Sequence, residues 1–291
     1  MLLPSDAAIF ANISHHLVNG KLLYRDVREH KQPVVFVINA LALKFGDGTF
    51  NSIRAAERYF AVGAAIAFFL ITVRTFVSSW IAATFTIIFL VYFYCPTTFS
   101  FGNFTEEYGT VLIILGVFCA IEAVLRENAL LTLLSGTFFS MSLLTKEPFL
   151  LSILPWVVYL LSGKEGRVKR FRFLIVGATF PFLLFFVYLI LTGTLANWLD
   201  MVYFTFGMAT EASISRDPLL YKLNRSAHVF STFVWYTRTV DVFFLLGVIS
   251  IFQKSFLKKY RYVPAVFPAW LLWAFLRQTF NICTPTTTTS R

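Results

Sequence analysis

Residues 173–191 read FLIVGATFPFLLFFVYLIL and contain no charged side chain. A helix needs roughly 20 such residues to cross the hydrocarbon core of a bilayer. Similar apolar runs recur along most of the chain, which is more than the core of a soluble domain requires. The stretch therefore predicts an all-α fold, namely a polytopic bundle of transmembrane helices in an integral membrane protein.

The composition agrees with this interpretation. Of the 291 residues, 57% are hydrophobic and only 14% are charged, whereas soluble domains carry about 25% charged residues. The net charge of +10 does not indicate a nucleic-acid partner, because the basic residues lie in loops between apolar runs. Membrane topology and contact with anionic lipid explain their position.

We expect about eight membrane spans within residues 53–280. They are predicted at about 53–73, 78–95, 107–125, 128–144, 148–162, 171–192, 238–253 and 263–280. A polar tail, 281–291, follows the last span. Nothing resembling a C-terminal domain follows it, so we expect the chain to be a fragment of a longer protein.

The loops between these spans are of two kinds. Lys and Arg recur in one set, whereas the short loops of the other set contain only Lys146. By the positive-inside rule the basic loops are cytoplasmic. The other set is then extracytoplasmic, and it comprises residues 1–52, 99–107, 145–148 and the long loop 193–237. The basic set comprises Arg74, Arg126, 164–172 and 254–261.

Residues 1–52 form the first extracytoplasmic loop in this topology. Residues 6–20 place apolar side chains at helical spacing on one face, and Asp6 and Gly20 suit the start and the end of that helix. Residues 33–45 are apolar but too short to span a bilayer. Both segments are predicted to be helices on the outer membrane face. Because no signal peptide precedes this outward loop, we expect a further span before it.

Charged side chains collect at the outer ends of the spans. They come from Asp6, the polar stretch 25–31 (RDVREHK), Glu106–Glu107 and Lys146–Glu147. Each cluster taken alone is explained by a solvated loop end, but four on one side favour a shared aqueous cavity. A carboxylate there can act as a general base, and Lys or Arg can hold a phosphate. Such a cavity suits an anionic, lipid-linked substrate.

Several segments resemble the GT-C glycosyltransferases. NGKLLYRDVREHKQP (19–33), INALALKFG (38–46) and NSIRAAERYF (51–60) are similar to the first outer loop of that family. FTEEYGTVLIIL (104–115) is similar to its second acidic motif, and LLTKEPFLLSILP (143–155) to its next outer turn. The closest groups are the bacterial protein O-mannosyltransferases and lipid A aminoarabinose transferases. The resemblance covers roughly residues 5–160.

The resemblance implies an inverting glycosyltransferase in the bacterial inner membrane, with an extracytoplasmic active site. The donor would be a polyprenyl-phosphate-linked sugar, and the acceptor a lipid, glycan or protein of the cell envelope. Asp6 matches the catalytic carboxylate of the first loop, although Ala7 and Ala8 follow it where the family often has Asp-Glu or Asp-Ser. Glu106 matches the second acidic residue and is also expected to be catalytic, and its close rival Glu107 is expected to contact substrate.

The resemblance also implies a set of substrate-binding residues. Lys31 and Lys146 are expected to contact the donor phosphate. Arg58 lies where the family has an arginine near the start of a span, and His30 precedes Lys31 in the family-like motif. Arg25 is included because it lies in the same polar stretch, where salt bridges that only fix the loop are an equal alternative.

Two other functions stay open at this point. A transporter or flippase for a lipid-linked saccharide would need polar residues deep within the spans. The spans contain few, and Glu122 and Asp241 lie near span ends. An inactive family member within a membrane assembly is the second alternative. We expect no cofactor beyond the donor substrate, and the sequence leaves the sugar, the acceptor and any divalent metal open.

Overall fold

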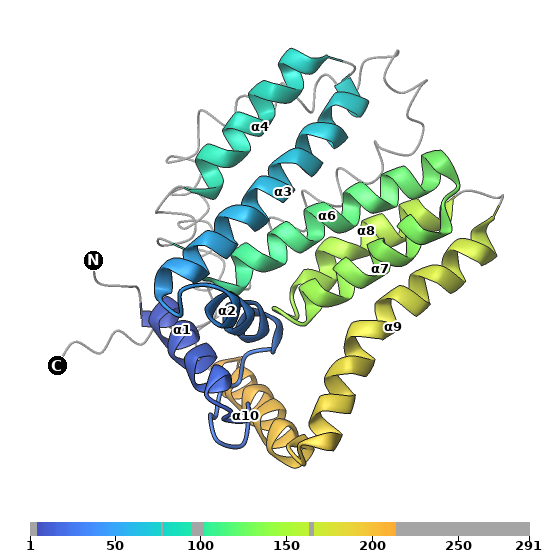
Figure 1. Ribbon diagram of the computed structural model, residues 1–291. Coiled ribbons are helices and arrows are strands. Elements are labelled where there is room, and N and C mark those ends of the chain that lie inside the picture. The colour runs from blue at the N-terminus through green and yellow to red at the C-terminus, as the bar shows by residue number, and fades with distance from the viewer. Residues whose placement is uncertain (1–4, 77, 95–101, 163–165, 214–291) are drawn as a thin grey trace. The chain divides into compact units, whose positions relative to one another are not determined.

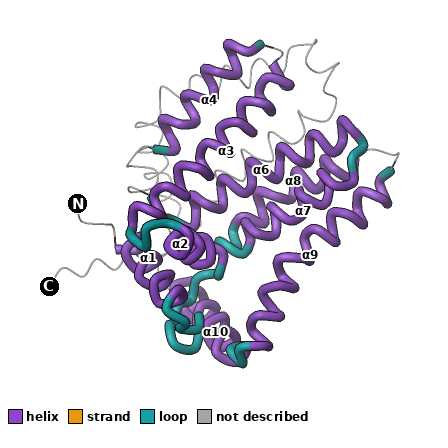
Figure 2. Tube along the Cα trace, viewed as in Figure 1, coloured by secondary structure: helices purple, strands orange, loops and turns teal. Residues whose placement is uncertain are grey.

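The computed structural model describes residues 5–76, 78–94, 102–162 and 166–213, and those residues form only helices and loops (Figures 1 and 2). The chain divides into two compact units, Met1–Val202 and Tyr203–Arg291. All helices up to α9 belong to the first unit, whereas α10 (Leu195–Ser213) runs across the boundary. The predicted all-α fold is therefore confirmed for the described part of the chain.

In the described part of the chain, three helices are long and apolar enough to cross a membrane. They are the Phe50–Arg74 part of α3 (Phe50–Phe76), α6 (Thr105–Arg126) and α9 (Arg167–Leu191). At about 1.5 Å per residue they extend roughly 33–37 Å, which exceeds the hydrocarbon core of about 30 Å. The outward face of α3 is apolar, as a lipid-facing helix requires. Its exposed large apolar side chains recur at helical spacing and are Tyr59, Val62, Ile66 and Leu70.

Three further helices coincide with predicted spans but are shorter. They are α4 (Ser79–Phe93), α7 (Ala129–Leu143) and α8 (Phe149–Ser162), with 14 to 15 residues each. The predicted spans 238–253 and 263–280 lie outside the described residues, as do the tail 281–291 and most of the loop 193–237. The start of that predicted loop is helix α10. About eight spans therefore stay a prediction.

The two segments that were predicted as loop helices are helical in the structure, as α1 (Ser5–Val18) and α2 (Val34–Phe45). Pro33 precedes α2, and Gly20 follows α1 with a φ of 81°, which glycine adopts without strain. The two helices pack together through buried side chains that include Phe10 and Phe36, whose rings meet edge to face. Their predicted place on the outer membrane face stays a prediction. An exposed apolar row on α2 is compatible with it: Val37, Leu41 and Phe45.

Small residues allow α7 and α9 to pack closely. A Cβ atom built on Gly177 of α9 would lie 2.0 Å from the carbonyl oxygen of Leu133, and one on Gly136 of α7 would lie 2.3 Å from that of Leu174. The Thr137 hydroxyl of α7 also donates to the Gly177 carbonyl at 3.1 Å. Close backbone approach of this kind is a common way in which helices associate in membranes.

The helices of the first unit run back and forth between two ends. The "site end" holds α1 and α2, the starts of α3, α6 and α8, and the end of α7 (Figure 1). The "basic end" holds the ends of α3 and α6 and the starts of α7 and α9. At the basic end, the buried Glu122 carboxylate bridges Arg74 of α3 and Arg126 of α6, with both Nε–O distances 2.6 Å. All the predicted site residues lie at the opposite, site end.

Candidate functional site

A buried polar network joins the elements of the site end. The Asn39 amide of α2 donates to Asn103 Oδ1 at 2.6 Å and accepts from the Tyr108 hydroxyl of α6 at 3.0 Å. Asn103 in turn donates to the backbone carbonyl of Ala7 in α1 at 2.9 Å. Asn39, Asn103 and Tyr108 are all at most 1% exposed. Such a satisfied network fixes the two loop helices against the start of α6.

Glu106 and Lys146 form an ion pair. Glu106 lies in the first turn of α6, and Lys146 lies in the turn between α7 and α8, 40 residues later. Lys146 Nζ donates to Glu106 Oε1, and each side chain is 23% exposed. The second carboxylate oxygen of Glu106 accepts from the hydroxyl of Thr105 at 2.8 Å. Two residues that the sequence assigned to one site are thus in direct contact.

The segment that carries Lys31 lies against the same turn. Gln32 Nε2 donates to Glu147 Oε1 at 2.6 Å, and the backbone N–H of Val34 donates to the Leu144 carbonyl at 3.1 Å. The carbonyl of Lys31 accepts from the buried hydroxyl of Tyr24 at 3.2 Å. Lys31 itself is half-buried. The neighbours of Lys31 therefore contact the neighbours of Lys146.

Asp6 is exposed and lies in the first turn of α1. Its neighbour Ala7 is fully buried, and the Ala7 carbonyl receives the hydrogen bond from Asn103. The position of Asp6 beside the loop that leads into α6 is thus fixed through its neighbour. The structure connects the segments of Asp6, Lys31, Glu106 and Lys146, although the direct side-chain contact among these four is the Glu106–Lys146 pair.

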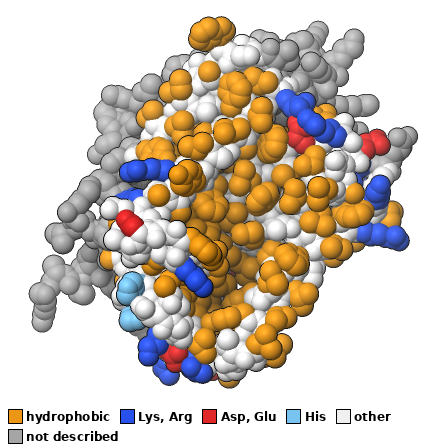
Figure 3. Space-filling view, viewed as in Figure 1, with side chains coloured by type: hydrophobic (Ala, Val, Ile, Leu, Met, Phe, Trp, Pro, Cys, Tyr) orange, Lys and Arg blue, Asp and Glu red, His pale blue; other side chains and the backbone are white. Residues whose placement is uncertain are grey.

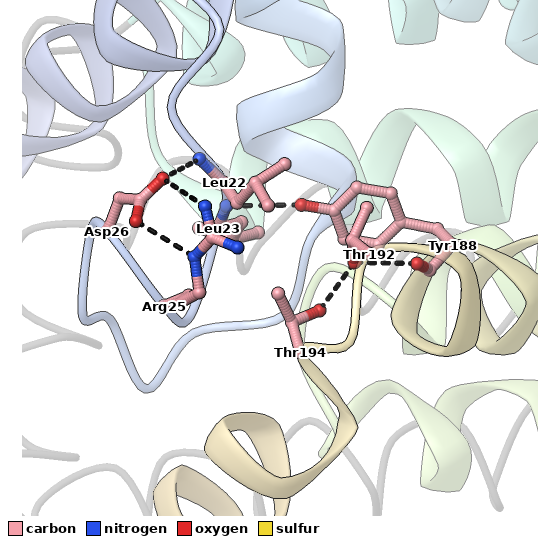
Figure 4. A network of polar contacts seen from close by, with 7 residues as sticks. All are labelled: Leu22, Leu23, Arg25, Asp26, Tyr188, Thr192 and Thr194. Carbon is pink, nitrogen blue, oxygen red and sulfur yellow. Dashed lines mark hydrogen bonds and ion pairs between the residues drawn. The ribbon is translucent and has the colours of Figure 1, made fainter.

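The beginning of the polar stretch 25–31 is held by local hydrogen bonds and by a contact of the preceding residues with α9. The Leu23 N–H donates to the Tyr188 hydroxyl of α9 at 3.1 Å, and Asp26 Oδ2 accepts from the Leu22 N–H at 2.9 Å (Figure 4). Arg25 Nε pairs with Asp26 Oδ1 at 3.0 Å. The hydrogen bond from Arg25, followed by that from Leu22, lowers the pKa of Asp26. Arg25 is therefore engaged in holding the loop, which supports the structural alternative for this residue.

His30 and Glu29 form a second local pair. His30 Nδ1 lies 2.8 Å from Glu29 Oε1, and the same oxygen accepts from the backbone N–H groups of His30 and Lys31 at 2.9 and 3.1 Å. Burial works to raise the pKa of Glu29, but the contacts with His30 and the two backbone donors outweigh it, so that the pKa lies below its usual value. The pair shapes the backbone immediately before Lys31.

The structure also reveals a buried acidic pair that sequence reasoning did not single out. Glu57 of α3 and Glu107 of α6 are each 5% exposed, and their charges repel each other. Arg54 Nη1 pairs with Glu57 Oε2 at 3.1 Å. One oxygen of each carboxylate is buried without a hydrogen-bond partner in the described part of the chain. A Cβ atom on Gly102 would lie 2.3 Å from Arg54 Nη1, so a larger residue there would displace the Arg54 side chain, and the φ of 93° at this position favours glycine.

The burial of Glu107 beside Glu57 distinguishes the two acidic candidates, Glu106 and Glu107. Glu107 is buried next to Glu57, whereas Glu106 is partly accessible and contacts Lys146. Arg58 is exposed at the start of α3, adjacent in sequence to Glu57. Of the two acidic neighbours, Glu106 is the one that faces a predicted phosphate-binding lysine.

Neither a metal-binding cluster nor a pocket adds residues to this site in the described part of the chain. Within the described ranges, no group of three or more His, Cys, Asp or Glu side chains is placed to hold a metal ion. Two pockets are lined by residues of the basic end and lie away from the predicted site. Comparison of the chain with known protein families, with curated proteins and with solved structures finds no match.

Proposed function

We propose that the chain is a membrane glycosyltransferase of GT-C type, acting on the extracytoplasmic face of a bacterial inner membrane. It transfers a sugar from a polyprenyl-phosphate donor to an acceptor lipid, glycan or protein of the cell envelope. The observation that supports this most is the Glu106–Lys146 ion pair, because it joins two family-like segments 40 residues apart. The Gln32–Glu147 contact brings the third such segment to the same turn.

The proposed reaction is a displacement at the anomeric carbon. The acceptor hydroxyl or amine attacks that carbon from the side opposite the phosphate and gives its proton to the carboxylate of Asp6. The bond between the anomeric carbon and the phosphate oxygen breaks, and its electron pair leaves with the polyprenyl phosphate. The sugar is transferred with inversion, and no oxidant or reductant is required.

Lys31 and Lys146 are proposed to stabilise the charge of the leaving phosphate. The Glu106–Lys146 ion pair is compatible with this role, because Glu106 holds the ammonium group of Lys146 in place before the polyprenyl-phosphate donor binds. An arriving phosphate then competes with Glu106 for Lys146. Arg58 and His30 are candidates for further donor contacts, since both are exposed at the site end.

Transfer by the full chain in native membranes tests this proposal. With a radiolabelled polyprenyl-phosphate sugar, we expect Asp6→Asn and Lys31→Ala to reduce the transfer rate by at least about a hundredfold, as for loss of a general base or a phosphate contact. Lys44→Ala is a matched control, because Lys44 is an exposed cation at the end of α2. Wild-type transfer by both test variants contradicts the proposed site. Movement of the intact lipid-linked sugar without transfer instead supports a flippase.

A further inference from the structure

The basic end of the bundle contains a pocket between the starts of α7 and α9. Its volume is about 70 Å³, and its lining residues are Glu127, Asn128, Ala129, Gly166, Lys169 and Arg170. A shallower depression over Gly166 to Lys169 adjoins it. Lys and Arg side chains gather along this edge of the molecule in the space-filling view, around the starting turns of α9 (Figure 3).

The described residues of the first unit are charged asymmetrically. The site end, with the start of α10, carries eight basic and nine acidic side chains, whereas the basic end carries six basic and two acidic ones. The basic end thus has a clear positive excess, as expected for a cytoplasmic face. Its basic side chains are Arg74, Arg126, Arg167, Lys169, Arg170 and Arg172, and its acidic ones are Glu122 and Glu127.

Most of these basic side chains lie at the N-terminus of a helix, where positive charge is least favourable. Four of the six cations fall within the first six residues of α9, whose first turn has no acidic residue and whose N-cap, Gly166, provides no side-chain acceptor. The N-terminus of a helix carries a partial positive charge, so cations there are unfavourable and an anion is favourable. Glu122 is already shared by Arg74 and Arg126, and it therefore does not offset the charge on α9.

The two basic side chains of the pocket differ in their surroundings. Arg170 Nε donates to the Leu160 carbonyl near the end of α8 at 2.9 Å, which fixes the arginine and closes one wall. Lys169 is exposed at the rim of the pocket. On the other wall, Asn128 caps α7 by accepting from the N–H groups of Leu130 and Leu131, while Glu127 remains as an opposing negative charge.

We propose that this pocket binds a phosphate-bearing anion, specifically the headgroup of an anionic lipid in the leaflet at the basic end. Basic pockets between transmembrane helices on the cytoplasmic side are a known form of lipid-headgroup site. The pocket lies at the beginning of α9, a candidate span, and lipid headgroups lie just outside the ends of membrane spans. It is distinct from the proposed donor site, because the 22 residues of α6 separate the two by about 30 Å.

Ligand-dependent thermal unfolding of the full chain in detergent tests this proposal. Dioctanoyl phosphatidylglycerol, dioctanoyl phosphatidylcholine and inorganic phosphate are titrated separately, and the rise in melting temperature gives an apparent Kd. Lys169→Glu and Arg167→Glu remove the proposed binding charge. Lys44→Glu is the matched control, since it reverses an exposed cation at the other end of the bundle.

We expect phosphatidylglycerol to bind the wild-type chain and the Lys44→Glu variant alike, and the Lys169→Glu variant at least about tenfold more weakly. The Arg167→Glu variant should weaken in the same direction, and phosphatidylcholine should produce no shift. A shift by inorganic phosphate that is equally sensitive to Lys169→Glu supports the site but identifies free phosphate as its source. Equal binding by wild type and both charge-reversal variants, or equal shifts with the two lipids, would overturn the proposal.

Discussion

Gly177 gives the sharpest test of how α7 and α9 pack. In a Gly177→Ala variant the new Cβ atom would lie 2.0 Å from the Leu133 carbonyl oxygen and 3.0 Å from its Cα. Comfortable carbon contacts lie near 3.5–4.0 Å, so the two helices must separate by roughly 1 Å or more. Overpacking of this kind costs about 1–3 kcal/mol. Both nearby groups belong to the backbone, which cannot give way as a side-chain tip can.

Two smaller effects modify that cost. Separation of the helices weakens the hydrogen bond from Thr137 to the Gly177 carbonyl, worth about 0.6 kcal/mol in membrane helices. Alanine in place of glycine returns about 1 kcal/mol of helix propensity. The net expectation is a loss of about 0.5–2.5 kcal/mol in the free energy of unfolding.

Unfolding by SDS titration from mixed micelles, followed by far-UV circular dichroism, measures this loss. Gly63→Ala in α3 is the matched control, because a Cβ atom there meets nothing within 4 Å. The control should be neutral or more stable by up to about 1 kcal/mol. If both variants unfold at the same SDS fraction as the wild type, the close α7–α9 crossing is wrong.

Three further predictions concern charge and hydrogen bonding. Glu122→Gln leaves two arginines without their shared carboxylate and should cost about 1–2 kcal/mol of unfolding free energy, less than for a fully buried pair because both arginines are partly exposed. The control Glu127→Gln should change the unfolding free energy by less than about 0.5 kcal/mol, and equal losses in the two variants would refute the bridge. Asn39→Leu strands two buried polar partners and should cost about 2–4 kcal/mol in the same assay, against less than about 0.5 for exposed Asn51→Ala; an unaffected Asn39 variant would disprove the network. The pKa of Glu29 is lowered in the folded chain, so the contribution of Glu29 to stability is fully present above its unfolded pKa of about 4.3 and is lost as the pH falls through the folded value. The melting temperature of wild type should therefore exceed that of Glu29→Gln at pH 6, and the difference should shrink towards pH 3. A difference that stays constant with pH would argue against the lowered pKa.

The helices of the site end were largely predictable because their signals are local. Pro33 before α2 and Gly20 after α1 mark helix boundaries whatever the rest of the chain does. The apolar face expected for residues 6–20 is buried only in part. Ile9, Phe10 and Ile13 share that face by helical spacing, but Phe10 and Ile13 are buried whereas Ile9 is 45% exposed. The difference arises because the rotation of a helix against its neighbours is set by tertiary packing.

The contacts of the site depend on distant parts of the chain. Topology predicts that Glu106 and Lys146 lie on the same side of the membrane, but not that they touch. Adjacent residues on a helix diverge by about 100°, and only the rotation of α6 decides that Glu106, rather than Glu107, faces the lysine.

Two contacts had no usable signal in the sequence. Glu57 looks like an ordinary charge at the beginning of a span, and its burial beside Glu107 follows from the approach of α3 and α6. The bond from Leu23 to Tyr188 joins residues 165 positions apart. No local pattern encodes such a pair, because it depends on how α9 returns to the first loop.

The exchange of Lys146 between Glu106 and a donor phosphate is the most direct test of the proposed site. Binding of a labelled polyprenyl phosphate to the full chain can be compared for wild type, Glu106→Gln and Lys146→Ala. Loss of a charge-assisted bond worth about 1.5–3 kcal/mol should weaken binding by Lys146→Ala about tenfold to a hundredfold. Glu106→Gln should bind more tightly than wild type, since the competing carboxylate charge is gone. Unchanged affinity in both variants, or an equal loss in both as a purely structural salt bridge would give, would contradict a phosphate site at Lys146.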